Sequence, residues 1–235
     1  MDELHMPGEF YHLDHPANDH HRRAEWDNEA MEGDHEIVYC PVNPGHQRAG
    51  GPRLKDLNVT LPKPPPQDIV WTWYSECLIQ DHVLEMFRQE GFTGFDVKPV
   101  TARFAKSGLA APKLWEFVLT GWGGMARPES GIRVNEKECC TACDYRPYTS
   151  MSRPAELIDK SQWDGSDFFM VWPMVNYIFT VDRVRKFIIS RKLTGAIFIR
   201  PQDLPIDGYS ISSVKLREYF PDDRAHQLGD PLGIY

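Results

Sequence analysis

Residues 76–100 read ECLIQDHVLEMFRQEGFTGFDVKPV, and this stretch has a counterpart later in the chain. Residues 177–201 read YIFTVDRVRKFIISRKLTGAIFIRP, and an offset of 101 residues aligns four identities between the two. The identities are Asp81 with Asp182, Val83 with Val184, and Thr93-Gly94 with Thr194-Gly195. Unrelated helix–strand units also reach this number of identities. The alignment therefore predicts similar architecture and leaves duplication as a hypothesis.

Both copies carry the same local pattern. We expect Asp81 and Asp182 to cap helices, because an aspartate carboxylate accepts hydrogen bonds from the free N–H groups of a first turn. Apolar residues follow at the spacing of one buried helix face. They are Val83, Met86 and Phe87 in the first copy, and Val184, Phe187 and Ile188 in the second. A Thr-Gly turn then leads into an extended segment, so the sequence predicts a helix, a turn and a strand twice.

Further strands lie between and after the copies. The segment LWEFVLTGW at residues 114–122 predicts a strand that ends at Gly-Gly. An Asp164-Gly165 turn precedes the aromatic strand at residues 167–172, DFFMVW. These aromatic residues are expected to be core. Strands and helices interspersed with loops predict an α+β fold with mixed or antiparallel sheets and two similar helix–turn–strand units.

We divide the chain into four regions on composition. Residues 1–36 hold six of the nine histidines and are predicted to form a polar arm, with a metal store or sensor as the alternative that their composition suggests. Residues 37–68 contain a short strand and loops rich in proline and glycine. Residues 69–205 form the predicted α+β core, with related halves at about 69–125 and 155–205. Residues 206–235 are predicted to be a peripheral tail.

The bulk composition narrows the function classes. Of the 235 residues 41% are hydrophobic and seven are Trp, which indicates a folded protein with a sizeable core. The net charge of −8 argues against nucleic acid and against an anionic membrane surface, and it is compatible with a basic protein partner. We find neither an apolar run as long as a membrane span nor a signal-peptide pattern, so we expect a cytoplasmic protein. An odd number of cysteines, five, is typical of a reducing compartment.

Three of the five cysteines lie in ECCTACDYRPY, residues 138–148. Cys140 and Cys143 have the C-x-x-C spacing of a redox pair or of half a metal site, and the spacing also occurs without function. A redox pair opens a helix, but here Glu136 and Glu138 precede the cysteines and Pro147 follows them, which disfavours a reactive thiolate. A zinc knuckle fits better, because two thiolates at this spacing can wrap one tetrahedral ion.

A structural zinc needs four ligands, and the C-x-x-C supplies two of them. The best source of the others is YCPVNPGHQ, residues 39–47, where Cys40 is followed by a turn that carries His46. We therefore predict a structural zinc site of Cys40, His46, Cys140 and Cys143, which makes a zinc-knuckle-like junction between the N-terminal lobe and the middle of the chain. Cys139 is an alternative to Cys140. A site without metal, with Cys40 in the core and His46 in solvent, also remains open, and Cys77 is expected to be core.

The order of these motifs resembles the double-CXXCG-motif family. The resemblance rests on the Cys-Pro turn at Cys40, the later C-x-x-C, the DFF of residues 167–169 and the closing helix–Thr-Gly–strand unit, and it spans about residues 37–203. The sequence departs from the family pattern twice: Asn43 stands where a second cysteine is expected, and Asp144 stands where the glycine of the second motif is expected. The ligands that match are Cys40, Cys140 and Cys143, and His46 is our own candidate for the fourth.

Proteins of that family are bacterial and are regarded as immunity proteins of polymorphic toxin systems. The resemblance thus implies a cytoplasmic immunity protein that binds and neutralises a cognate toxin by direct contact, without catalytic residues. The negative charge favours a basic toxin. The alternative is a zinc-dependent enzyme with an open thiolate-rich site and Glu136 or Asp144 as its base. A catalytic pair of Asp164 and Asp167 is a weaker explanation of that segment than a turn.

Overall fold

Two sheets organise the protein in the computed structural model, which describes residues 9–16, 22–106, 108–206, 208–209 and 211–235. The first sheet has the strand order β10 (Trp122–Met125), β11 (Phe168–Trp172), β12 (Ile178–Val181), β1 (Phe10–Asp14) and β13 (Ile197–Ile199). The second has the order β2 (Glu25–Trp26), β5 (Leu57–Leu61), β8 (Phe95–Phe104), β9 (Leu114–Leu119), β7 (Cys77–Gln80) and β6 (Ile69–Trp71). Two strand pairs, β10 with β11 and β5 with β8, are parallel and the others antiparallel.

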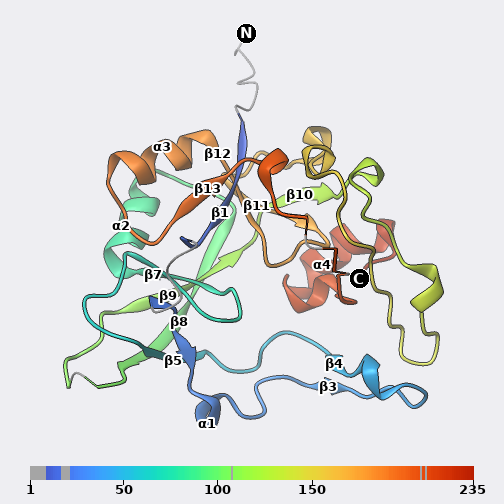
Figure 1. Ribbon diagram of the computed structural model, residues 1–235, viewed down its shortest axis with the longest axis horizontal. Helices are drawn as coiled ribbons and strands as arrows, with labels where there is room; N and C mark the ends of the chain where they lie inside the picture. Colours follow the sequence, from blue (N-terminus) through green and yellow to red (C-terminus); the bar gives the residue numbers. More distant parts are fainter. Residues whose placement is uncertain (1–8, 17–21, 107, 207, 210) are drawn as a thin grey trace.

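The remaining elements complete an α+β fold, as the sequence predicts. The helices are α1 (Asn28–Met31), α2 (Asp81–Gln89), α3 (Asp182–Ser190) and α4 (Asp222–Gly229). A separate ladder pairs β3 (Ile37–Val38) with β4 (Arg48–Ala49). Figure 1 shows α2 and α3 at one end of the molecule and the β3–β4 ladder at the opposite end. Within the described part of the chain, none of the helices is long and apolar enough to cross a membrane.

The two helix–turn–strand units belong to larger repeated assemblies. The first runs β6, β7, α2, β8, and the second runs β11, β12, α3, β13. In each, a fourth strand lies antiparallel between the strand before the helix and the strand after it. In the first assembly this strand is β9, which follows β8 in the chain. In the second it is β1, which comes from the N-terminal region. The two assemblies therefore share a strand arrangement but differ in chain order.

Each Thr-Gly turn bonds to the other assembly. Asp167, just before β11, accepts hydrogen bonds from the Thr93 backbone N–H at 2.8 Å and from the Thr93 hydroxyl at 3.0 Å. Asp68, just before β6, accepts the same two bonds from Thr194, each at 2.7 Å. The backbone N–H of each aspartate donates back to the threonine hydroxyl, at 3.2 and 3.0 Å respectively. We call these contacts the Thr–Asp clamps, and they hold the two assemblies together reciprocally.

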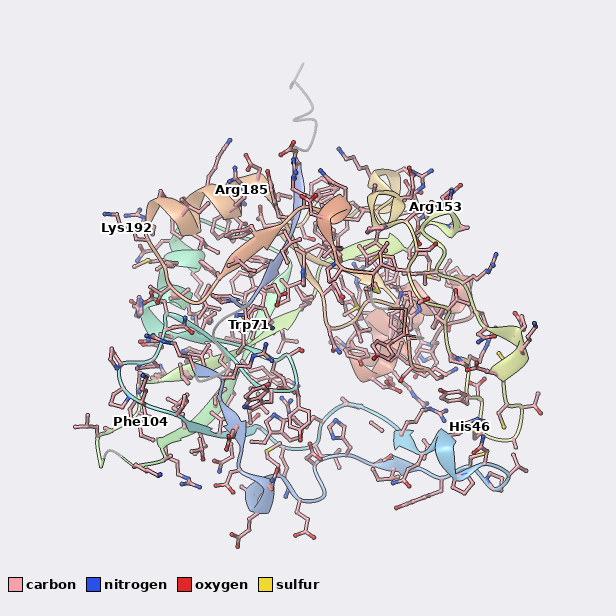
Figure 2. All side chains as sticks on the ribbon, in the orientation of Figure 1. His46, Trp71, Phe104, Arg153, Arg185 and Lys192 are labelled. Atoms are coloured by element: carbon pink, nitrogen blue, oxygen red, sulfur yellow. The ribbon has the colours of Figure 1, made fainter. Side chains whose placement is uncertain are left out.

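The core lies between the assemblies. All five residues of β11 are buried, which confirms the aromatic strand as core. Phe168 packs against Phe87 of α2 and Phe117 of β9, with ring centroids 5.5 and 4.8 Å apart. Figure 2 shows Trp71 near the middle of the molecule, where its indole N–H donates to the Gly195 carbonyl at 2.9 Å. Aromatic packing of this kind adds to the burial of apolar area in stabilising the interface.

The predicted helix caps are wrong. Gln80 and Val181 occupy the N-cap positions, while Asp81 and Asp182 are the first helical residues. The Asp81 carboxylate accepts from the Trp115 indole at 2.7 Å, and that of Asp182 pairs with Arg185. The reason is that each helix begins directly after a strand, so the N-cap residue still belongs to the sheet. The buried helix faces consist of Val83, Leu84 and Phe87 in α2, and of Val184 and Ile188 in α3.

The prediction of a polar arm at residues 1–36 is wrong for residues 10–14, which form β1 inside a sheet. Residues 10–13 are buried on both faces, so the strand lacks the alternation that would have revealed it in a histidine-rich segment. The His12 ring stacks on Tyr177, with centroids 4.4 Å apart. His5, His20 and His21, which the metal-store alternative needs, lie outside the described residues.

The prediction of a peripheral tail is also wrong. Leu216, Phe220, Ala225 and Ile234 are buried in the main core. The tail is polar overall because α4 places only a narrow stripe against the core, and composition alone cannot distinguish such a helix from a solvated segment. The Asp164-Gly165 turn is confirmed: Gly165 has a φ of +88°, and the Asp164 side chain accepts from the Ser166 N–H at 3.0 Å.

The close contact between the two assemblies at the Thr93-Gly94 turn predicts that Gly94 cannot be replaced by alanine without loss of stability. Gly94 has a φ of +85°, and a Cβ placed on it would lie 1.9 Å from the Phe168 carbonyl oxygen. Gly91, with a φ of +66°, has no atom within 4 Å of such a Cβ. Both Ala variants incur the cost of left-handed backbone, ~1 kcal/mol, but only Gly94→Ala must also push the two assemblies apart. We expect Gly94→Ala to lower the free energy of unfolding by about 3 kcal/mol more than Gly91→Ala in urea titrations. Equal losses would contradict this account of the turn.

A second prediction concerns β1. Burial lowers the pKa of His12 to about 4, against the opposing charge of Asp14, and Nδ1 of His12 finds no hydrogen-bond partner among the described residues. Between pH 6.5 and 4 the unfolded chain therefore binds a proton that the native protein does not, so stability falls as pH falls. His12→Phe keeps the ring and removes the titration. We expect the wild type to lose about 2 kcal/mol more than His12→Phe between pH 7 and pH 5. Parallel pH profiles would refute the assignment.

Candidate metal centre

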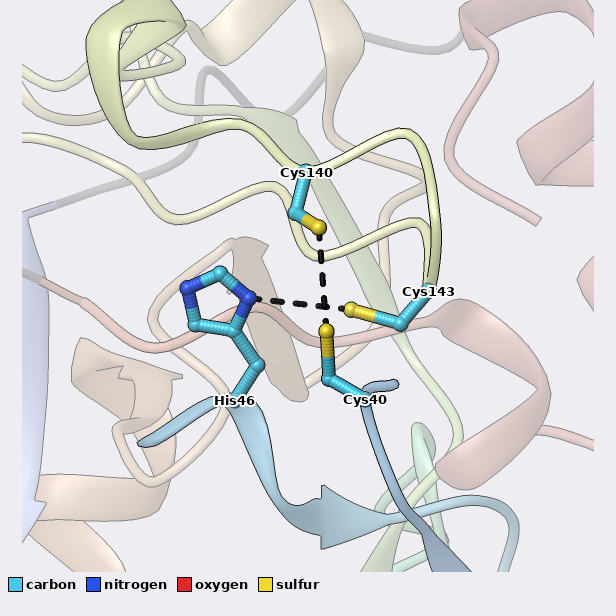
Figure 3. Close-up of side chains that lie close together, drawn as sticks. All are labelled: Cys40, His46, Cys140 and Cys143. Carbon is cyan, nitrogen blue, oxygen red and sulfur yellow. Dashed lines mark hydrogen bonds between the residues drawn. The ribbon is translucent and has the colours of Figure 1, made fainter. Parts of the chain in front are cut away.

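The candidate centre lies where the β3–β4 ladder meets the middle of the chain. Cys40 follows β3, and His46 ends the short 3-10 turn Pro44–His46 just before β4. On the other side, Cys140 and Cys143 lie in a tight hairpin that is closed by a hydrogen bond of 2.9 Å from the Cys140 N–H to the Tyr145 carbonyl. Two loops about 100 residues apart in sequence thus present their side chains to one point (Figure 3).

The four side chains that the sequence selects do come together. One ligand atom from each of Cys40, His46, Cys140 and Cys143 lies within 4.8 Å of all the others. The Cys40 and Cys140 sulfurs are 3.8 Å apart, and the Cys143 sulfur is 3.7 Å from His46 Nδ1. A tetrahedral ion with Zn–S bonds of about 2.3 Å and Zn–N bonds of about 2.0–2.1 Å separates its ligands by roughly 3.8 Å and 3.6 Å respectively. These two distances match one tetrahedral metal site.

Neighbouring side chains orient the His46 ring. Its Nε2 lies 2.9 Å from the amide nitrogen of Asn43, and the ring stacks on Tyr145 with centroids 4.2 Å apart and planes within 8°. Asn43 is the residue that stands where the family pattern has its second cysteine. It contacts the ring of the histidine that supplies the fourth donor. Partners of this kind fix the orientation of a ligand and tune its affinity.

The hairpin that holds Cys140 and Cys143 has aspartate at the position where the resemblance predicts glycine. Asp144, in the place of the expected glycine, has a φ of +54°. Aspartate enters this left-handed region more readily than most residues, because its short side chain finds local hydrogen bonds. Its carboxylate pairs with Lys215. Asp144 therefore adopts the left-handed backbone conformation that a glycine would favour at this position.

The electrostatics favour thiolate at Cys40. Burial raises the pKa of this thiol, but the backbone N–H groups of Val42 and Asn43 stabilise its thiolate, and the pKa falls to about 6. The Asn43 N–H lies 3.3 Å from the sulfur. The pKa of Cys143 is raised by burial and by its contact with Cys40. Arg48 offsets part of this, with its guanidinium 3.8 Å from the Cys143 sulfur and 2.7 Å from the Cys143 carbonyl.

The other cysteines lie outside the cluster. Cys139 directs its sulfur to the Asn135 carbonyl at 3.5 Å, and Cys77 is buried in the core. Of the two bases suggested for an enzyme, Asp144 is engaged by Lys215 and Glu136 lies on an exposed 3-10 turn. Sequence motifs do not reveal the contacts that Asn43, Arg48 and Tyr145 make with the cluster, although each of these residues lies within three residues of a ligand.

Comparison with the models of known protein families finds no match, and comparison with curated proteins finds none either. The resemblance to the double-CXXCG-motif family therefore stays a prediction. Independently of that resemblance, the distances among the four side chains show that they could hold a metal ion.

The cluster makes a prediction with a matched pair of variants. Cys140→Ser removes a donor, whereas Cys139→Ser changes the neighbouring thiol that faces away from the cluster. We expect one zinc per chain in the wild type and in Cys139→Ser. In Cys140→Ser the zinc affinity should fall more than about 100-fold, beyond the loss typical of an outer-shell change. Elemental analysis and competition with a chelator measure this. Equal zinc content in both variants would rule out the assigned ligand set.

Proposed function

We propose that this protein is a zinc-stapled, non-catalytic binding protein that neutralises a bacterial toxin by direct contact. The observation that carries the proposal is the set of four protein donors that lie within 4.8 Å of one another. Three sulfurs and one imidazole nitrogen form a Cys₃His set, which favours zinc over the hard cations that prefer oxygen. A zinc held by four side chains has no coordination position left for water or substrate. This supports a structural role and disfavours the zinc-enzyme alternative.

The zinc would fasten one end of a lobe formed by residues 37–56. At the other end of this lobe, Arg53 pairs with Glu116 of β9, and both side chains are nearly buried. The lobe is thus tied to the hairpin of Cys140 and Cys143 on one side and to the second sheet on the other. A scaffold braced in this way keeps its surface in one conformation, which lowers the entropic cost of binding a partner.

We place the toxin contact at the tip of the β6–β7 hairpin. Trp73 and Tyr74 are 45% and 59% exposed there, and the Tyr74 ring lies 4.5 Å from that of Trp26. Aromatic side chains on a fixed turn are typical anchors of protein interfaces. Exposed Glu25 and Glu29 on the adjacent edge add negative charge, in line with the net charge of −8. Arg23, whose guanidinium lies 4.9 Å from the centre of the Trp73 ring, offsets part of this charge, so the proposed contact depends more on the aromatic side chains than on charge.

The test uses the full-length protein and the toxin candidates encoded beside its gene. We expect one of them to co-purify with it and to lose its toxicity when the two are co-expressed. Trp73→Ala with Tyr74→Ala should weaken this binding at least about 30-fold, the effect of losing an interface hot spot. Tyr209→Ala, at a residue 77% exposed elsewhere, is the matched control and should bind like the wild type. If no neighbouring product binds and none is neutralised, the toxin-binding function is wrong.

A further inference from the structure

We propose that Cys40 and Cys140 form a site of reversible oxidation, where a peroxide converts the two thiolates into a disulfide and expels the metal. The inference rests on the zinc centre proposed above. It adds a chemical reaction to a centre that otherwise only braces the fold.

The distance between the two sulfurs is the first observation. They are 3.8 Å apart, and a disulfide requires about 2.05 Å, so the sulfurs must approach by less than 2 Å. Neither cysteine lies in a strand of the two large sheets. Cys40 belongs to the loop between β3 and β4, and Cys140 to the hairpin closed by Tyr145. Loops of this kind adjust at lower cost than paired strands, so the approach does not require the core to move.

The surroundings make the pair both accessible and selective. Cys140 is partly exposed and Cys40 is 9% exposed, and their neighbours Pro41, Val42, Thr141 and Ala142 are exposed, so a small oxidant reaches the cluster first at Cys140. Cys77 is only 3% exposed inside β7 and is shielded from such an oxidant.

The two remaining thiols have other contacts. Cys143 faces His46 Nδ1 at 3.7 Å and the Arg48 guanidinium at 3.8 Å. Cys139 faces the Asn135 carbonyl instead of the cluster. Cys143 also contacts the Cys40 thiol, but its position between His46 and Arg48 engages it with two further groups. We therefore assign the disulfide to Cys40 and Cys140, whose sulfurs are 3.8 Å apart.

The reaction balances with hydrogen peroxide as the oxidant. One thiolate attacks a peroxide oxygen and breaks the O–O bond, which gives a sulfenic acid and hydroxide. The second thiolate attacks the sulfenic sulfur, forms the S–S bond and expels a second hydroxide, which is protonated to water. Two sulfurs thus lose two electrons in all, and the peroxide is reduced to two waters. A dithiol reverses the reaction by thiol–disulfide exchange.

The consequence concerns the junction between the two loops. The disulfide would join the same two segments that the metal joins, so the lobe would stay attached after the metal leaves. Cys143 and His46 would remain as two donors, and two donors do not retain a structural zinc. Peroxide should therefore release zinc while the lobe remains tied to the hairpin.

The experiment treats the zinc-loaded full-length protein with hydrogen peroxide. A chromogenic chelator follows zinc release, and mass spectrometry of unreduced peptides locates the disulfide. We expect one zinc released for each Cys40–Cys140 linkage formed, and recovery of both thiols with dithiothreitol. Cys139→Ser should behave like the wild type.

A second variant separates this inference from the zinc proposal. Cys143→Ser lacks a metal ligand but keeps both partners of the disulfide, so it should form the Cys40–Cys140 linkage without any zinc to release. A wild type that binds no zinc, beside a linked Cys143→Ser, would overturn the zinc proposal while leaving the thiol pair standing. A Cys140–Cys143 linkage, oxidation to sulfinic acid without a linkage, or zinc retained after peroxide would overturn the inference drawn here.

Discussion

The reciprocal Thr–Asp clamps are the contacts on which the rest of the fold depends. The Asp167 carboxylate is only 4% exposed, and a buried carboxylate is destabilising unless its oxygens are satisfied. Here it accepts from both polar groups of Thr93 and pairs with Arg183. At the equivalent site, burial raises the pKa of Asp68, but hydrogen bonds from Thr194 and His82 outweigh this and lower it. The clamp at Asp68 therefore favours an ionised carboxylate, and separating the assemblies would leave the hydrogen-bonding groups of both clamps without their partners.

The clamps also show which part of the repeat a single sequence reveals. The two Thr-Gly turns align at one offset, because their distance from the preceding helix is the same in both copies. Their partners do not share that offset: Asp68 and Asp167 are 99 residues apart, since the second hairpin and turn differ in length from the first. The fourth strand was harder still to predict. β9 and β1 occupy equivalent positions in the two sheets. In the chain, β9 follows the other strands of its assembly, whereas β1 precedes those of its own, so sequence order does not reveal that the two strands are equivalent.

The metal cluster was more predictable, because ligand chemistry restricts it to a few residue types. The C-x-x-C spacing and the turn that follows Cys40 sufficed to select Cys40, His46, Cys140 and Cys143. The sequence did not show how the two loops hold these side chains. Asn43 contacts the ring of His46, and Asp144 adopts a left-handed backbone conformation. The Asn43 contact and the Asp144 conformation depend on how the loops fold and touch one another, and a single sequence does not show this.

The lobe of residues 37–56 differs from the two sheets in the interactions that stabilise it. β3 and β4 pair over only two residues each, and so short a ladder is not stable on its own in water. Ile37, Tyr39 and Val42 are exposed, so the lobe has little core of its own. A cleft of about 270 Å³ separates its inner edge from the sheets, and Arg53 and Glu116 line it as a pair. The order of the sheets follows from buried aromatic residues and the clamps. The order of the lobe follows from a few polar links and, in our proposal, from one metal ion held by four side chains. Oxidation of those side chains would then change the lobe while the core stays folded.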